Sequence, residues 1–117
     1  MARSAHRQQF LADILATAIE GGINHWADVD ATDTDVFGRQ YTSARILDRE
    51  DGSEFGTMHI VDLDTIAHGL TELVASDEYP FTELRKANRT SGGEGDYDAA
   101  DADAIVQFGL YEHIIYG

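Results

Sequence analysis

The sequence predicts an α+β fold, in which an N-terminal helix, a small antiparallel sheet and then further helices form a single domain over residues 1–117. Three observations predict it: an apolar helical stripe near the N-terminus, two β-rich segments on either side of an Asp-Gly pair, and an apolar segment near the C-terminus. No apolar run is long enough to span a membrane, and the polar N-terminus lacks the core of a signal peptide. We therefore expect a cytoplasmic protein with no membrane contact.

The N-terminal half is expected to contain one helix and two or three strands. A helix is predicted over residues 4–20, because its apolar side chains share one stripe and two glycines end it. Residues 23–29 alternate like a short strand, with a helical turn as the alternative, and residues 30–38 are expected to be a polar loop. A hairpin over about residues 40–61 follows, with a tight turn at its Asp-Gly pair. The sheet has three strands if residues 23–29 join it.

The C-terminal half is expected to be helical. A helix capped by aspartate is predicted to end near residue 75, and a short one covers residues 81–88, with Pro80 in its first turn. The last helix, over residues 98–115, is apolar around most of its circumference, which is typical of a central helix. Gly109 in its middle costs about 1 kcal/mol relative to Ala, so we expect a neighbouring element to approach closely there.

The charge of the chain is strongly negative and unevenly distributed. Twenty-two acidic residues against eight basic ones give a net charge of −14. Residues 27–38 sum to −4, residues 51–78 to −7 and residues 91–117 to −6, with neutral or basic segments between them. This balance excludes direct nucleic-acid binding by attraction to phosphates. It is either a compositional property of the source organism or a directional field that a binding partner recognises.

The densest acidic cluster, residues 96–103, is a candidate for a divalent-metal site. Asp96, Asp98 and Asp101 are the candidate ligands, because Mg²⁺ and Ca²⁺ prefer oxygen donors. The spacing does not match a calcium-binding EF-hand loop, and capping of the last helix is the alternative interpretation. Cysteine is absent, no two histidines have i, i+4 spacing, and no catalytic signature occurs. We therefore predict no bound cofactor and favour a non-enzymatic protein.

Three stretches resemble a group of small acidic proteins of actinobacteria and their phages. They are residues 18–27 (AIEGGINHWA), residues 62–70 (DLDTIAHGL), and residues 88–98 leading into the final apolar helix, which ends in Ile-Tyr-Gly. The group has no assigned activity, so the resemblance transfers no functional residue. It implies a phage or prophage accessory protein in the cytoplasm of a host cell.

We expect this protein to act by binding a host or viral protein. In the sharpest form of the hypothesis it mimics DNA and inhibits a host nucleic-acid-binding or defence enzyme; self-association is left open. A ligand- or metal-binding protein that uses residues 96–103 is the alternative. The candidate partner-binding residues are two aromatic side chains and the acids of the negative blocks: Trp26, Asp28, Asp30, Asp33, Asp35, Asp62, Asp64, Tyr97, Asp98 and Asp101.

Overall fold

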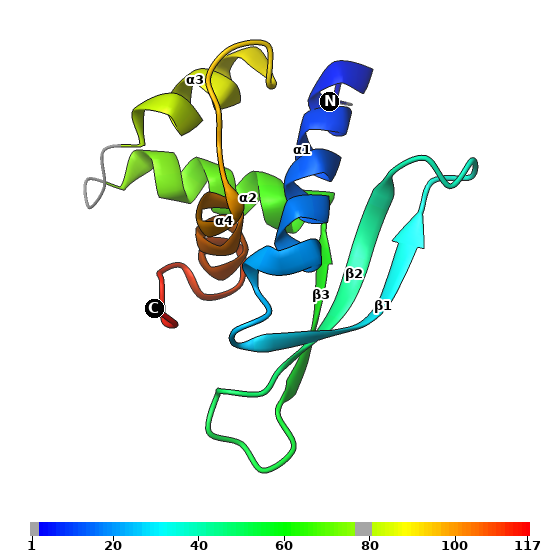
Figure 1. The fold of residues 1–117 in the computed structure, drawn as a ribbon, viewed down its shortest axis with the longest axis vertical. Helices are drawn as coiled ribbons and strands as arrows, with labels where there is room; N and C mark the ends of the chain where they lie inside the picture. The colour runs from blue at the N-terminus through cyan, green and yellow to red at the C-terminus, as the bar shows by residue number, and fades with distance from the viewer. Residues whose placement is uncertain (1–2, 77–80) are drawn as a thin grey trace.

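A computed structural model describes residues 3–76 and 81–117 and confirms the α+β class (Figure 1). Pro80 lies outside the described residues. The described elements follow one another in the order α1 (Ala5–Thr17), the π-helical turn η1 (Ala18–Gly22), β1 (Ala27–Thr34), β2 (Tyr41–Asp48), β3 (Thr57–Asp62), α2 (Leu63–Ala75), α3 (Thr82–Thr90) and α4 (Ala99–Tyr111).

The three strands form an antiparallel meander in the order β1-β2-β3, and the helices lie on one side of it (Figure 1). Ala44 and Ile46 of β2 and Val61 of β3 are buried on the helix side. Met58 and Ile60 alternate with these inward positions and therefore lie on the outer face, which no described helix covers. The sheet thus has one core face and one solvent face.

The first strand lies four to five residues further along the chain than predicted. The expected strand over residues 23–29 is confirmed for residues 27–29 and wrong for residues 23–26, which form a turn whose Ile23 and Trp26 side chains enter the core. The expected loop over residues 30–38 is wrong for its first half, which continues β1. Its polar side chains tolerate a strand because they lie at a solvated edge and contact β2: Asp30 pairs with Arg45 and Asp33 accepts from Ser43.

The hairpin over residues 40–61 is confirmed, but its predicted tight turn is wrong. Eight residues, 49–56, connect β2 to β3 and form a loop that projects from the body of the protein (Figure 1). The Asp51 carboxylate organises this loop by accepting hydrogen bonds from the Ser53 amide and hydroxyl groups at 2.9 and 2.6 Å, and from the Thr57 hydroxyl. Asp51 therefore serves the longer loop instead of a two-residue turn.

The contact between α2 and α4 forms the centre of the helical layer. A side-chain carbon at Gly109 would lie 2.5 Å from the backbone oxygen of Thr65, and one at Gly69 would collide with the backbone oxygen of Ile105. The predicted close approach at Gly109 is therefore confirmed, and Gly69 is its counterpart on α2. Ile105 and Val106 of α4 are buried, in agreement with a central helix.

The last helix ends at Tyr111, four residues earlier than predicted. Glu112 adopts a left-handed conformation with φ of 66°, which turns the chain out of the helix. The buried side chain of Gln107 then holds the tail: its Oε1 accepts from the amides of Ile115 and Tyr116 at 2.8 and 2.9 Å, and its Nε2 donates to the Tyr116 carbonyl. Residues 113–117 consequently fold back onto the core.

Candidate functional site

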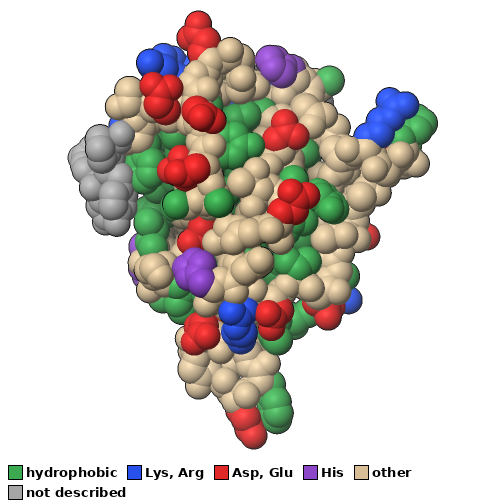
Figure 2. Space-filling model, in the orientation of Figure 1, with side chains coloured by type: hydrophobic (Ala, Val, Ile, Leu, Met, Phe, Trp, Pro, Cys, Tyr) green, Lys and Arg blue, Asp and Glu red, His purple; other side chains and the backbone are tan. Residues whose placement is uncertain are grey.

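Exposed apolar side chains lie on the outer face of the sheet and on the loops at its two ends. The β1–β2 connection exposes Val36 and Phe37 at 94% and 73%, and the β2–β3 loop exposes Phe55 at 83%. On the outer face, Met58 and Ile60 are 46% and 58% exposed. Figure 2 shows hydrophobic side chains at the ends of both projecting loops. We call these five residues the apolar sheet surface.

Both projecting loops are ordered by an aspartate. The Asp35 carboxylate accepts from the amides of Phe37 and Arg39 at 3.1 and 2.9 Å, and the Asp35 amide donates to the Gln40 carbonyl at 3.0 Å. In the other loop, hydrogen bonds from Ser53 and Thr57 lower the pKa of Asp51 to about 2. The exposed phenylalanines therefore sit on structured turns.

The predicted partner-binding acids of β1 are flanked by arginines. Asp28 pairs with Arg49 at 2.9 Å and Asp30 pairs with Arg45 at 2.8 Å. All four side chains are substantially exposed, so each pair contributes about 0–1 kcal/mol to stability. Their main effect is to neutralise part of the first negative block.

The predicted acids of the other two blocks mostly begin helices. Asp62 caps α2 by accepting from the Thr65 amide at 2.9 Å, while Asp64 pairs with Arg3 at 2.5 Å. Asp98 caps α4 by accepting from the Asp101 amide at 2.9 Å. These carboxylates, which were predicted to bind a partner, therefore have structural roles within the fold.

The predicted metal ligands engage neighbouring backbone amides. The Asp101 carboxylate accepts from the Asp98 amide at 3.1 Å, which completes a reciprocal capping box, and the Asp96 carboxylate accepts from the Tyr97 amide at 2.8 Å. Burial raises the pKa of Asp101. Within residues 3–76 and 81–117, the single group of three side chains with donor atoms mutually within 4.8 Å lies elsewhere, on α2 and α4. Helix capping is therefore the role that the structure shows for Asp98 and Asp101.

The two predicted aromatic contacts differ in exposure. Trp26 is fully buried, stacks on Tyr116 with a ring separation of 5.2 Å, and donates from Nε1 to Asp103 at 2.8 Å. It is a core residue with no surface for a partner. Tyr97 is partly buried against Phe10 in an edge-to-face arrangement at 6.1 Å, and burial raises the pKa of its hydroxyl.

A buried polar network joins the sheet to the C-terminal tail. The Asp48 carboxylate is fully buried and accepts from the hydroxyl groups of Tyr111 and Tyr116 at 2.5 and 2.7 Å. The Tyr111 hydroxyl also lies 3.0 Å from Nε2 of His59. Partial burial and the nearby Asp48 carboxylate raise the pKa of Tyr116 to about 12 and raise that of Tyr111 as well. Because Asp48 is buried, we interpret this network as a structural latch, that is, a set of hydrogen bonds that attaches the C-terminal tail to β2.

No family model, curated protein or solved structure matches the chain. No helix among the described residues has the length and apolar character needed to cross a membrane. The apolar sheet surface was missed at the sequence level. The sequence does contain one indication of it. Val36, Phe37 and Phe55 lie in polar, turn-rich segments, in which an apolar side chain is difficult to bury.

Proposed function

We propose that this chain is a small acidic, non-enzymatic binding protein of phage or prophage origin that docks on a host or viral protein in the host-cell cytoplasm. The observation that carries the proposal is the exposure of Phe37 and Phe55 on ordered loops at the two ends of the sheet. The phage setting rests on the resemblance of residues 18–27, 62–70 and 88–98.

Exposed aromatic side chains on structured turns suit recognition of a protein. Phenylalanine buries a large apolar area in a partner pocket, and an ordered loop loses little conformational entropy on binding. The acids of β1 and the arginines paired with them, Arg45 and Arg49, lie near this surface, so the matching partner surface combines apolar pockets with polar and charged side chains. Self-association through the same surface is the competing arrangement.

DNA mimicry is the more specific form of this proposal. It requires unpaired carboxylates from residues 27–38, 51–78 and 91–117 to share one face. The arginine pairs of Asp28 and Asp30 and the capping roles of Asp62 and Asp98 weaken the support for this form. The alternative of Ca²⁺ or Mg²⁺ binding at Asp96, Asp98 and Asp101 has less support for the same reason.

Affinity capture from an actinobacterial host lysate tests the proposal. The baits are the wild type, the double variant F37S/F55S, and the matched control I115S, whose substituted residue is 47% exposed outside the apolar sheet surface. We expect a partner that the wild type and I115S retain at high salt and that F37S/F55S loses, because apolar contacts resist salt screening. Size-exclusion chromatography with light scattering identifies self-association.

The outcomes separate the three forms of the proposal. A partner that DNA displaces and that high salt releases equally from all baits supports mimicry instead of apolar docking. Equal capture of every protein by the wild type and F37S/F55S contradicts the role of the loops. A melting-temperature increase with Ca²⁺ or Mg²⁺ that D98N removes would favour the metal alternative.

A further inference from the structure

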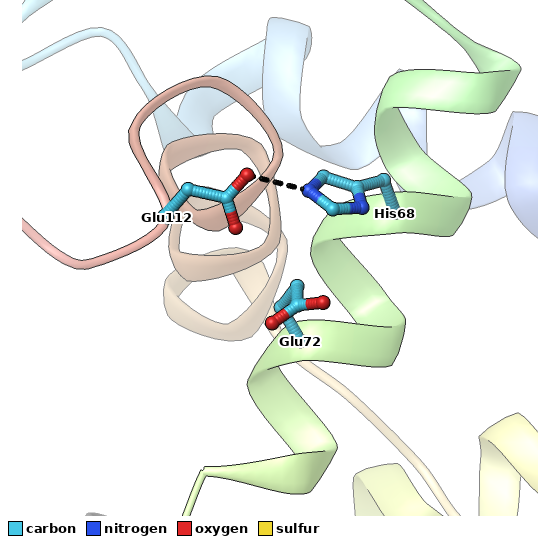
Figure 3. A group of neighbouring side chains, drawn as sticks. All are labelled: His68, Glu72 and Glu112. Atoms are coloured by element: carbon cyan, nitrogen blue, oxygen red, sulfur yellow. Dashed lines mark hydrogen bonds and ion pairs between the residues drawn. The ribbon is translucent and has the colours of Figure 1, made fainter.

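A histidine and two glutamates converge where α2 passes the end of α4 (Figure 3). His68 and Glu72 are one helical turn apart on α2, at i and i+4, so their side chains lie on the same face. Glu112 approaches them from the C-cap of α4, and its Oε1 lies 2.8 Å from Nε2 of His68. One donor atom from each of the three residues lies within 4.8 Å of the other two.

The two helices hold these side chains on closely packed backbones. Gly69, next to His68, faces the backbone of Ile105, and Gly109, three residues before Glu112, faces the backbone of Thr65. These contacts leave no room for a side chain between the helices, so the separation between α2 and α4 is fixed next to the cluster. The ligands therefore come from a rigid frame, which lowers the cost of assembling a site.

Glu112 occupies a position at which glycine is the usual residue. Its left-handed conformation, with φ of 66°, ends α4, and Figure 3 shows its carboxylate directed toward His68 on α2. The ion pair between His68 and Glu112 is exposed to solvent and therefore contributes little to stability. Stability of the fold therefore does not explain this arrangement. With a donor atom from Glu72, the three side chains form a set suited to a cation.

We propose that His68, Glu72 and Glu112 bind a divalent transition-metal ion, with Zn²⁺ as the representative ion. One imidazole nitrogen and two carboxylate oxygens are Zn²⁺ ligands, and three protein ligands leave a fourth position for water. Ligand atoms around a tetrahedral Zn²⁺ lie about 3.4 Å apart, given bonds of about 2.1 Å. Small side-chain rotations at exposed His68 and Glu112 supply this contraction without backbone movement.

The donor set also predicts selectivity. Imidazole favours Zn²⁺, Ni²⁺ or Co²⁺ over Mg²⁺ and Ca²⁺, which prefer oxygen-only sites. The two carboxylates balance the charge of a divalent ion. This site is separate from the predicted Asp96–Asp101 cluster and from the apolar sheet surface, so it stands independently of the proposed binding function.

Metal titration of the full chain tests the site. Isothermal titration with Zn²⁺ measures stoichiometry and affinity, and visible absorption with Co²⁺ reports coordination by the protein directly. We expect one ion per chain, and we expect H68A and E72Q each to weaken Zn²⁺ binding by at least about tenfold, the lower end of the loss seen for supporting residues of metal sites. The matched controls H113A and E94Q change exposed residues outside the cluster and should bind Zn²⁺ like the wild type.

Two results would overturn the proposal. One is the absence of Zn²⁺ binding to the wild type at 1:1 stoichiometry with about 100 μM protein, a concentration that detects even a weak site. The other is equal Zn²⁺ binding by the wild type, H68A and E72Q. If H113A then loses Zn²⁺ binding, the ion is bound elsewhere. The variants alter exposed or surface side chains, and E112Q provides a third measurement if either variant is unstable.

Discussion

The helical layer and the outer side of the sheet differ in how much of their apolar surface is buried. Between α2 and α4, glycines bring backbones into contact and a buried carboxylate ties the sheet to the C-terminal tail. On the outer sheet, phenylalanines project into solvent on loops that aspartates order. The buried contacts are concentrated in the helical layer, and the outer sheet is the side that we propose for binding. Four predictions test this division, from the largest expected effect to the smallest.

Removal of the buried carboxylate at Asp48 should cause a large loss of stability. D48A leaves the hydroxyl groups of Tyr111 and Tyr116 without their acceptor, so we expect a loss of about 3 kcal/mol in the free energy of unfolding. Urea denaturation measures the loss. The matched control is D30A, which breaks an exposed pair with Arg45 and should cost less than about 1 kcal/mol. Equal losses in D48A and D30A would contradict the latch.

A methyl group at Gly69 should separate α2 from α4. G69A places a carbon against the backbone of Ile105, and we expect a loss of about 2 kcal/mol, because overpacking outweighs the gain in helix propensity. Thermal and urea unfolding measure this loss. G21A is the control, since a side chain at Gly21 meets no atom within 4 Å, and its stability should be unchanged or higher. Destabilisation by both substitutions would show that the helix contact is not responsible.

Alkaline pH should weaken the attachment of the C-terminal tail. In the folded protein, burial and the hydrogen bond to Asp48 raise the pKa of Tyr116 from an ordinary value of 10.0 to about 12. The folded state therefore binds this proton more tightly than the unfolded state does. The resulting stabilisation is complete below pH 10 and declines as the pH rises toward 12. Urea midpoints across this range should fall more steeply for the wild type than for Y116F. Parallel profiles would rule out Tyr116 as the responsible group.

Substitution of the loop phenylalanines should barely change stability. The side chains of Phe37 and Phe55 are mostly in solvent, so F37S and F55S should each shift the free energy of unfolding by less than about 0.5 kcal/mol. The same variants are expected to lose partner binding, which separates the two regions experimentally. F10S, at a buried core position, should by contrast lose several kcal/mol. A large loss for F37S or F55S would mean that the loops belong to the folded core.

Local patterns in the sequence were enough to predict the class of fold and most helices. The stripe over residues 4–20 and the capping aspartates of α2 and α4 act within a few residues, so the sequence exposes them directly. The predicted bounds of strand β1 were too early, because the sequence alone does not show that its aspartates pair with side chains of β2. Asp30, for example, pairs with Arg45. The end of α4 was missed because Gln107 holds the tail through contacts eight and nine residues away.

The candidate sites were harder to predict because they depend on tertiary packing. The i, i+4 spacing of His68 and Glu72 was visible in the sequence, but Glu112 joins them only where α4 ends. The exposure of Phe37 and Phe55 depends on the length of the two connections, of which one was expected to be a tight turn. Trp26 illustrates the reverse case, since an aromatic residue that could have served a partner is enclosed by Tyr116 and Tyr111.

The enclosure of Trp26 also makes the chain its own optical probe. It is the only tryptophan in the sequence, and it lies where the sheet, α4 and the tail meet, in contact with Tyr116 and Asp103. Its fluorescence emission should be blue-shifted in the folded protein and move to longer wavelength on unfolding. A partner docked on the exposed loop phenylalanines should leave this emission unchanged, because the Trp26 side chain is fully buried. One spectrum can therefore distinguish a variant that has lost its fold from a variant that has lost only its partner.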